Sequence, residues 1–336
     1  MTATAEPLLE IQDLRKYFPI QKGFLRRTVG YVKAVDGVNL TVQPGETVGV
    51  VGESGSGKTT LGRTLLRLYE PTAGSVKLRV NGETFVVTEL DGNKLRNLRR
   101  NAQMIFQDPY SSLNPRMTVL ETVGEPLFVN GLASGRDMEE RVKEVITQVG
   151  LRVEHLRRYP HSFSGGQRQR IGIARALVVK PKLVVADEPV SALDVSVQAQ
   201  TLNLLKDLQA QYQLTYLFIT HAMNVVRYMC DRIAVMYAGK MVELGTKTQV
   251  LTTPKHPYTE ALLSSVPRTT SRTRTKRIVS TGEVPDLGNL PSGCVFHPRC
   301  KYAIDRCKTE VPQLRQIASG QLASCHRAEE LALQGI

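Results

Sequence analysis

The chain has 336 residues, of which 41% are hydrophobic and 22% charged, and its formal net charge is +13. This length allows one large domain and a smaller one, and the composition excludes a disordered or fibrous protein. No apolar run approaches the roughly 20 residues that cross a bilayer, and residues 1–7 lack the basic-then-apolar layout of a signal peptide. We therefore expect a cytosolic protein whose five cysteines are reduced or metal-bound rather than disulfide-paired.

The positive net charge is compatible with nucleic acid, an anionic membrane surface or an anionic nucleotide as a partner. Part of the excess is local, because residues 268–277 hold five basic side chains and no acidic one. Such a run is typical of a solvated linker, and it has no interleaved aromatic side chains that could stack on bases. The charge therefore argues only weakly for nucleic-acid binding.

Residues 8–50 alternate like β-structure, with a basic, glycine-containing surface loop expected over 21–30. Tyr17 lies in this region, where an aromatic ring could stack on a nucleotide base. An equally good reading is a strand-end tyrosine that packs on the core, and Tyr31 is a second candidate for the stacking role.

A glycine-rich stretch over 52–60 follows the apolar run 47–51 and precedes the helix-like run 61–68. The stretch consists of Gly52, Glu53, Ser54, Gly55, Ser56, Gly57, Lys58, Thr59 and Thr60. It matches G-x-x-x-x-G-K-[ST] in the strand–loop–helix context of a phosphate-binding loop, whose glycines let backbone N–H groups face phosphate oxygens. Lys58 is predicted to hold the β- and γ-phosphates of a nucleoside triphosphate, and Thr59 to ligate Mg²⁺.

Two features follow in the next 50 residues. Asn81-Gly82 predicts a hairpin turn between two short strands within 76–87. An apolar strand over 104–106 then ends in Gln107, just before a proline. A glutamine at a strand end beside a magnesium nucleotide could contact the metal and the attacking water, although most such glutamines face solvent.

Residues 110–160 change character and predict an inserted helical subdomain. Apolar residues at helical spacing over 142–149 indicate an amphipathic helix that ends at Gly150. A second glycine turn then leads into a helix over 171–179. This turn consists of Ser164, Gly165, Gly166 and Gln167. One nucleotide needs one phosphate cradle, so we expect this second anion site to serve a nucleotide held by another subunit.

A continuous apolar run over 183–186 indicates a strand buried on both faces, and it ends in Asp187 and Glu188. Adjacent carboxylates in such a place favour metal or phosphate chemistry over a solvent-facing turn. We predict that Asp187 holds Mg²⁺ and that Glu188 polarises the attacking water. A second buried strand over 215–219 leads to His221, a candidate γ-phosphate sensor that orients water.

In this order, the first ~265 residues resemble the ATP-binding cassette of ABC transporters. The resemblance implies that Gln107 is the Q-loop glutamine, that 164–167 is the signature sequence, and that 191–194, ending in Asp194, is the D-loop. It also implies that His221 is the switch histidine and that two cassettes dimerise head to tail, with ATP between the phosphate loop of one and the signature of the other. Gln107 would also contact Mg²⁺.

The stretches 107–116, 186–194 and 256–258 look like those of dipeptide and oligopeptide importer ATPases. This likeness implies a second, paralogous ATPase subunit, two membrane permease subunits, an extracytoplasmic peptide-binding protein and a position on the cytoplasmic face of the membrane. Phe163 replaces a common leucine, and Ala222 replaces the usual aspartate after His221. Rival functions are import of nickel or another small solute, and DNA repair or translation.

The C-terminal region adds four cysteines, Cys294, Cys300, Cys307 and Cys325, whereas Cys230 is expected to be a buried core thiol. Four cysteines in a reducing compartment suggest a metal, but no C-x₂-C spacing supports a zinc ribbon. The importer family carries a similar set that binds a [4Fe–4S] cluster in some members, so we expect such a cluster, with zinc or free thiols as alternatives.

Together these features predict an α/β fold of the P-loop NTPase class, an ABC cassette with a parallel-sheet core, an antiparallel β-subdomain and a helical subdomain. We expect the cassette to span 1–265, with its helical subdomain at about 108–175. The importer-type extension with the four cysteines would span 266–336.

Overall fold

The computed structural model describes residues 6–24, 26–265 and 285–336, so the basic run predicted to be a linker lies outside the described residues. The chain divides into two compact units that are interleaved in sequence. The first comprises Met1–Leu9, Val42–Glu46 and Lys77–Phe218, and the second Glu10–Thr41, Thr47–Val76 and Ile219–Ile336. Among the described helices, none combines the length and the apolar character that a membrane crossing needs.

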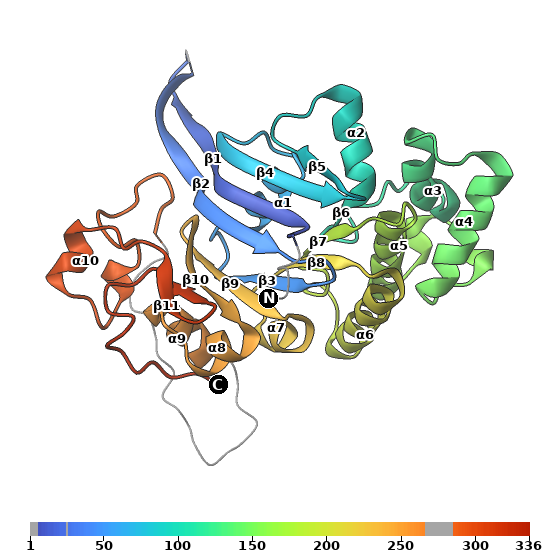
Figure 1. Ribbon diagram of the computed structural model, residues 1–336. Coiled ribbons are helices and arrows are strands. Elements are labelled where there is room, and N and C mark those ends of the chain that lie inside the picture. The colour runs from blue at the N-terminus through green and yellow to red at the C-terminus, as the bar shows by residue number, and fades with distance from the viewer. Residues whose placement is uncertain (1–5, 25, 266–284) are drawn as a thin grey trace. The chain divides into compact units, whose positions relative to one another are not determined.

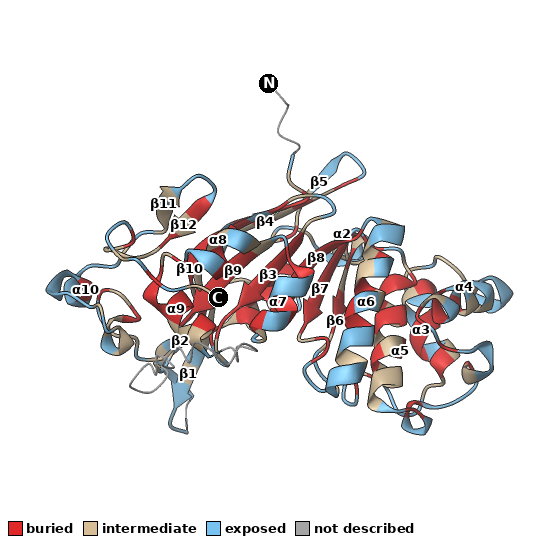
Figure 2. Ribbon diagram, turned by 90° about the horizontal axis from the view of Figure 1, so that it is seen from below, coloured by how far each residue is buried: buried red, intermediate tan, exposed pale blue. Residues whose placement is uncertain are grey.

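The first unit contains three neighbouring strands in the order β8-β7-β6. These strands are β6 (Ala102–Ile105), β7 (Leu183–Asp187) and β8 (Thr215–Thr220), whose last two residues are assigned to the second unit. Every residue of β7 and β8 is buried, and both strands are red in Figure 2. Their unbroken apolar runs therefore match strands that are covered on both faces, as the sequence predicted.

The predicted hairpin is also confirmed. β4 (Ala73–Val80) and β5 (Glu83–Val86) pair antiparallel, and Asn81 and Gly82 connect them with positive φ angles of 53° and 82°. Positive φ at both central residues of a two-residue loop is the geometry that asparagine and glycine tolerate best.

Five helices of the first unit are described. They are α2 (Gly92–Asn101), α3 (Val119–Val129), α4 (Gly135–Gln148), α5 (Gly165–Leu177) and α6 (Val195–Tyr212). α3 packs against both α4 and α5, as Figure 1 shows in green. The apolar face predicted over 142–149 is buried in α4, and the helix is followed by Gly150 with a φ of +74°. The predicted amphipathic helix is therefore confirmed, and it begins seven residues earlier.

The second unit holds the strand that precedes the phosphate loop. β3 (Thr47–Val51) is entirely buried and pairs in parallel with β9 (Arg232–Tyr237), which pairs antiparallel with β10 (Lys240–Thr246). β1 (Leu9–Lys22) and β2 (Arg27–Val42) are neighbours in a separate sheet. The surface loop predicted over 21–30 is therefore shorter than expected, because both strands extend into it.

The helices of the second unit are short. They are α1 (Lys58–Leu65), α7 (Met223–Met229), α8 (Lys247–Thr252), α9 (Pro257–Ser264) and α10 (Asp305–Thr309). The described C-terminal segment, residues 285–336, adds two further strands. β12 (Gln321–Ala323) pairs antiparallel with β10, and β11 (Arg315–Ala318) pairs antiparallel with β12. Residues 315–323 therefore add two strands beyond β10 to the sheet that contains β3.

A buried polar cluster fixes the C-terminal segment to β10. The Glu243 carboxylate accepts hydrogen bonds from the Lys255 and His256 N–H groups, at 2.8 and 3.0 Å, and from Gln321 Nε2 at 2.9 Å. Burial raises the pKa of Glu243. The hydrogen bonds matter because a buried carboxylate without them would be strongly destabilising.

His256 in this cluster predicts a pH-dependent stability. Its ring is buried, its Nδ1 accepts the Tyr258 N–H at 3.1 Å, and burial lowers its pKa to about 3. The unfolded pKa is about 6.5, so the unfolded chain binds a proton first as the pH falls. We expect the free energy of unfolding to be largest above pH ~6.5 and to fall by up to ~1.4 kcal/mol per pH unit below it.

The variant His256→Asn isolates this effect, because the asparagine oxygen can accept the same N–H but does not titrate. Urea unfolding at pH 7 and pH 5 should show a smaller loss of stability in the variant than in the wild type. Equal losses in both proteins would show that His256 does not carry the pH dependence.

Candidate functional site

The phosphate loop of the second unit closes around the Lys58 side chain. The loop leaves β3 after Val51, which pairs with Val235 of β9, and it enters α1 at Lys58. Lys58 is 5% exposed, and its Nζ donates to the Gly52 and Glu53 carbonyl oxygens, each at 2.8 Å. The predicted strand–loop–helix is therefore present, with the lysine ammonium held inside the curve of the loop.

Gly57 fits this loop because it lacks a side chain. Its φ is +102°, and a Cβ at this position would lie 2.0 Å from the Ala34 carbonyl oxygen. The variant Gly57→Ala must therefore shift the loop, and we expect the affinity for ATP to fall about 10- to 100-fold. Titration with a fluorescent ATP analogue measures this change.

Gly172→Ala is the matched control for that substitution, because Gly172 lies in α5, has no positive φ, and, beyond its own helix backbone, no described residue comes within 4 Å of a Cβ built there. Its affinity should equal that of the wild type. If Gly57→Ala also bound ATP normally, the loop would not need the close approach seen in the structure.

The C-terminal segment contributes a side chain, Arg299, that forms an ion pair with the phosphate loop. The sequence analysis did not identify this residue. Arg299 Nη1 and Nη2 lie 2.8 and 3.1 Å from the two carboxylate oxygens of Glu53. The Glu53 N–H also donates to the Tyr258 hydroxyl at 2.7 Å. The ion pair raises the pKa of Arg299. Glu53 and Arg299 are 246 residues apart in the sequence, and no local pattern in the sequence signals their contact.

In the first unit, the strand register brings Gln107 to the acidic pair. β6 and β7 are parallel and Ile105 pairs with Ala186, so the residues that follow both strands emerge at the same edge. Gln107 Nε2 donates to Glu188 Oε2 at 3.1 Å. Asp187 is fully buried, whereas Glu188 is half-buried and has a φ of +45°. A non-glycine residue in this left-handed region is strained, a feature that clusters at functional sites.

These donors suit Mg²⁺, which prefers carboxylate and amide oxygens and the hydroxyl of a phosphate-loop threonine. Asp187 and Gln107 lie at the strand ends of the first unit, and Thr59 lies in the first turn of α1 in the second unit; that these residues hold one Mg²⁺ stays a prediction. His221 directly follows β8 and is exposed. Its role as γ-phosphate sensor stays a prediction.

The second glycine turn begins α5. Ser164 Oγ accepts the Gln167 N–H at 3.3 Å, and Gln167 Oε1 accepts the Ser164 N–H at 3.1 Å. This reciprocal capping fixes the turn of Ser164, Gly165, Gly166 and Gln167 at a helix N-terminus, where backbone N–H groups favour an anion. Asp194 caps α6 in a similar way by accepting the Val197 N–H at 3.0 Å, and this bond lowers the pKa of Asp194.

Tyr17 lies on β1 with its hydroxyl bound to Asp36 Oδ1 at 2.5 Å. Asp36 also pairs with Lys240 Nζ at 2.7 Å, and burial together with the Asp36 bond raises the pKa of Tyr17 to about 12. The Tyr31 side chain is 52% exposed. Stacking of either ring on a nucleotide base stays a prediction.

Our prediction of an iron–sulfur cluster is wrong. Among the described residues, no group of three or more His, Cys, Asp or Glu side chains is placed to hold a metal ion. Cys294, Cys300, Cys307 and Cys325 do line one cavity, but its volume of about 20 Å³ is little more than one water needs. Burial raises the pKa of Cys300 to about 12 and that of Cys325 to about 11, so both groups are protonated thiols at neutral pH in this structure. Cys230 is a fully buried thiol, as predicted.

A family model described as "ABC transporter" matches residues 35–191, and one described as "Oligopeptide/dipeptide transporter, C-terminal region" matches residues 242–307. The ATP-binding cassette MJ0796, solved as a dimer in a post-hydrolysis state with ADP and Pi, is 30% identical with a TM-score of 0.61. The match covers 71% of this chain and 98% of that one.

Among curated proteins, the oligopeptide transport ATP-binding protein AppF of Bacillus subtilis is 51% identical over 96% of this chain and 98% of its own length. The dipeptide transport ATP-binding protein DppF of Haemophilus influenzae is 48% identical over 95% of this chain and 96% of its own length. Both relatives align with nearly the whole chain, so the similarity includes the two regions that the family models match. The chain belongs to the ABC transporter family, and within it to the oligopeptide/dipeptide transporter ATP-binding proteins.

Proposed function

We propose that this chain binds and hydrolyses ATP, with Mg²⁺, to power peptide uptake through a membrane importer. The observation that carries the proposal is the phosphate loop curled around Lys58, together with the Gln107–Glu188 hydrogen bond at the edge of a parallel sheet. Glu188 would orient and deprotonate the attacking water, and Lys58 would stabilise charge on the transferred phosphoryl group. The printed names of AppF and DppF support peptides as the cargo.

The capped turn at Ser164 would close over a nucleotide held by a second ATPase subunit, which we propose is a paralogue. A solved relative is described as dimeric, which supports this arrangement. Val195 next to the Asp194 cap is 82% exposed, so a large apolar side chain is available there for a partner. The cassette would span 1–265 and the importer-type extension 266–336.

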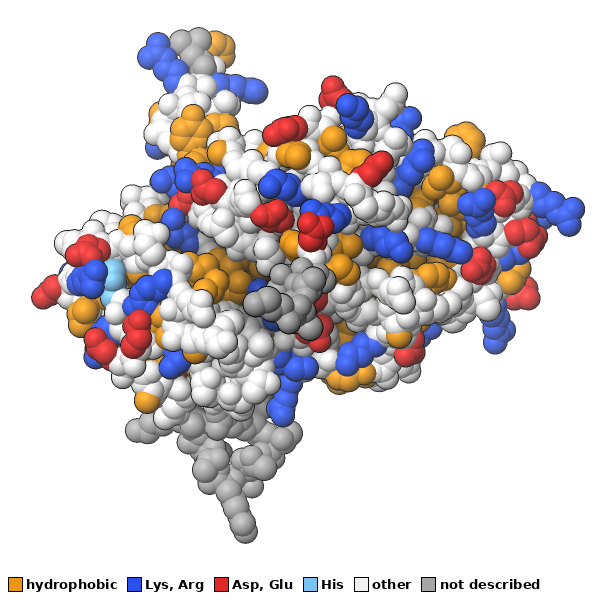
Figure 3. Space-filling model, in the orientation of Figure 1, with side chains coloured by type: hydrophobic (Ala, Val, Ile, Leu, Met, Phe, Trp, Pro, Cys, Tyr) orange, Lys and Arg blue, Asp and Glu red, His pale blue; other side chains and the backbone are white. Residues whose placement is uncertain are grey.

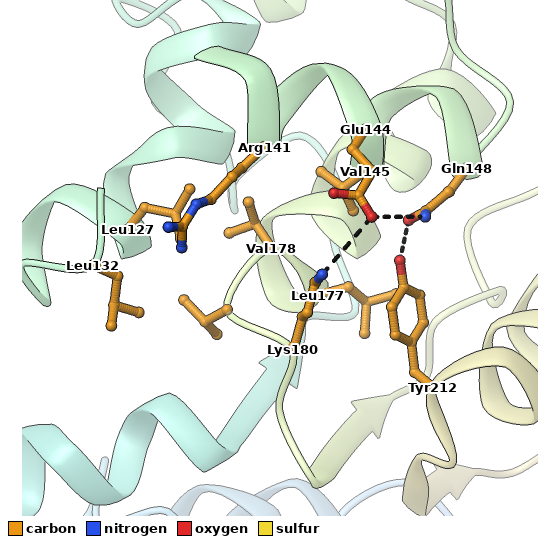
Figure 4. Close-up of a pocket in the computed structure, with 11 residues that line it drawn as sticks. Leu127, Leu132, Arg141, Glu144, Val145, Gln148, Leu177, Val178, Lys180 and Tyr212 are labelled. Atoms are coloured by element: carbon orange, nitrogen blue, oxygen red, sulfur yellow. Dashed lines mark hydrogen bonds and ion pairs between the residues drawn. The ribbon is translucent and has the colours of Figure 1, made fainter. Parts of the chain in front are cut away.

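A pocket of the first unit is suited to a membrane partner. It has a volume of about 330 Å³ and lies between the ends of α3, α4, α5 and α6 (Figure 4). Apolar side chains such as Leu127, Leu132 and Val145 line it, and Arg141, Glu144 and Lys180 add charged groups (Figure 4). We propose that a short cytoplasmic helix of a permease subunit docks here, which would place the ATPase at the cytoplasmic face of the membrane.

Leu132→Asp tests this docking site, because Leu132 is half-buried in the pocket. A docked apolar helix would bury the new carboxylate, which is energetically costly. ATP binding by the variant alone should stay normal, while co-purification with its permease subunits should be lost. Val153→Asp, at a 41% exposed apolar side chain outside the pocket, should leave the complex intact. Retained binding by Leu132→Asp would place the permease contact elsewhere.

The rival function in DNA repair or translation needs a basic face. On the face shown in Figure 3, acidic side chains lie among the basic ones. Several basic side chains are paired locally, as in Arg306–Glu310, Arg327–Glu330 and Arg141–Asp137. Stimulation of the ATPase by DNA or ribosomes, without any bound permease, would favour the rival. Import of nickel or another small solute would be decided by the extracytoplasmic binding protein, and uptake assays of the whole importer separate these cargoes.

A further inference from the structure

The contact between the C-terminal segment and the phosphate loop is more extensive than an ordinary surface ion pair. The Arg299 side chain is 9% exposed, and its guanidinium binds the Glu53 carboxylate through two parallel hydrogen bonds. Arg299 Nη1 also donates to the Tyr237 hydroxyl at 3.3 Å. Phe296 packs edge-on against Tyr237 and Tyr258, with ring centroids 5.1 and 5.4 Å apart. Contacts with Tyr237 and Phe296, in addition to the ion pair, therefore fix the position of the Arg299 side chain.

The charge of Glu53 explains why such a partner matters. Glu53 is the one acidic residue of the loop over 52–60, which is the stretch expected to receive a triphosphate. An unpaired carboxylate there would repel the phosphates and lower their affinity. A bidentate arginine neutralises this charge and also fixes the orientation of the side chain.

The backbone of Glu53 is fixed as well. Its N–H donates to the Tyr258 hydroxyl at 2.7 Å. Its carbonyl oxygen accepts the Lys58 ammonium at 2.8 Å and the Ser56 N–H at 3.2 Å. A displacement of Glu53 would therefore move an acceptor that orients Lys58. Glu53 therefore links Arg299 of the C-terminal segment to Lys58, the residue predicted to hold the phosphates.

We propose that Arg299 is a positioning residue of the nucleotide site: its ion pair compensates the Glu53 carboxylate, which would otherwise repel a triphosphate from the phosphate loop. The inference rests on the proposed ATP site, and it assigns to the C-terminal segment a direct part in ATP affinity. Arg299 itself touches Glu53 and is not required to contact the nucleotide.

Arg299→Ala tests the proposal in the full-length chain. We expect the dissociation constant for ATP and the KM for ATP to rise about tenfold, with kcat at saturating ATP changed less than about threefold. Arg306→Ala removes an exposed ion pair of the same segment, Arg306–Glu310, and should leave both values unchanged. Arg299→Lys should give an intermediate affinity, since lysine keeps the charge but not the two parallel bonds.

A second variant separates this role from mere stabilisation of the fold. In the double variant Arg299→Ala with Glu53→Gln, the loop no longer carries an uncompensated carboxylate, so ATP affinity should recover most of the tenfold loss. A structural role predicts no recovery, because the double variant lacks the same ion pair. Thermal unfolding of each variant shows whether it is folded at the assay temperature.

The outcomes also distinguish this inference from the proposed function. If Lys58→Ala retains ATP binding, the nucleotide site itself is wrongly assigned. If Lys58→Ala loses ATP while Arg299→Ala binds it normally, or if the double variant shows no recovery, the site stands and the proposed compensation of the Glu53 charge by Arg299 is overturned.

Discussion

Glu188→Gln is expected to lower the rate of ATP hydrolysis about 10²- to 10⁴-fold while ATP still binds. The replacement amide keeps an oxygen that can accept the Gln107 Nε2 hydrogen bond, seen at 3.1 Å, so the geometry at the strand ends should persist. It cannot take a proton from the attacking water, which removes the general base. Because hydrolysis would reopen the proposed dimer, the variant should accumulate as an ATP-bound dimer.

Phosphate release and size-exclusion chromatography with ATP and Mg²⁺ measure the two effects. Glu154→Gln, at an exposed position of the same unit, is the control and should hydrolyse ATP like the wild type. Normal turnover by Glu188→Gln would refute the assignment of Glu188. Slow turnover with no dimer would instead separate the catalytic role of Glu188 from the proposed sandwich.

Lys58→Ala should abolish measurable ATP binding, with a loss of affinity of about 100-fold or more. A lysine ammonium that binds two phosphate oxygens contributes charge-assisted hydrogen bonds of about 1.5–3 kcal/mol each. The substitution also removes the buried cation that bridges the Gly52 and Glu53 carbonyl oxygens, so the loop loses its internal support.

Titration with a fluorescent ATP analogue measures the loss, and circular dichroism checks that the fold persists. Lys94→Ala removes an exposed lysine of α2 and should bind ATP normally. Unchanged affinity in Lys58→Ala would mean that the nucleotide binds elsewhere on the chain.

The cysteines show where prediction from sequence fails. Their number and their clustering within 294–325 are visible in the sequence, and the structure does bring them around one cavity. Whether the described cysteines can hold a metal depends on how their side chains are placed and on the size of the cavity that they line, about 20 Å³. Both depend on packing, and no spacing rule reports them.

Local chemistry was enough to predict the elements that hold the site. The hairpin at Asn81-Gly82, the buried strand before Asp187 and the strand–loop–helix at Lys58 each follow from residues close together in the chain. Backbone preferences and hydrophobic periodicity act over a few residues, and they are therefore readable without a structure.

Contacts between distant residues were decided by the tertiary structure. The parallel register of β6 and β7 selects Gln107 as the partner of Glu188, across 81 positions of sequence. The fold of the C-terminal segment brings Arg299 to Glu53 across 246. The sequence by itself determined the local elements that carry the candidate residues for binding and hydrolysing ATP, because these elements follow from chemical type and local spacing. Only the packed chain decided which partners orient them, because a hydrogen bond depends on ångström distances that sequence separation does not encode.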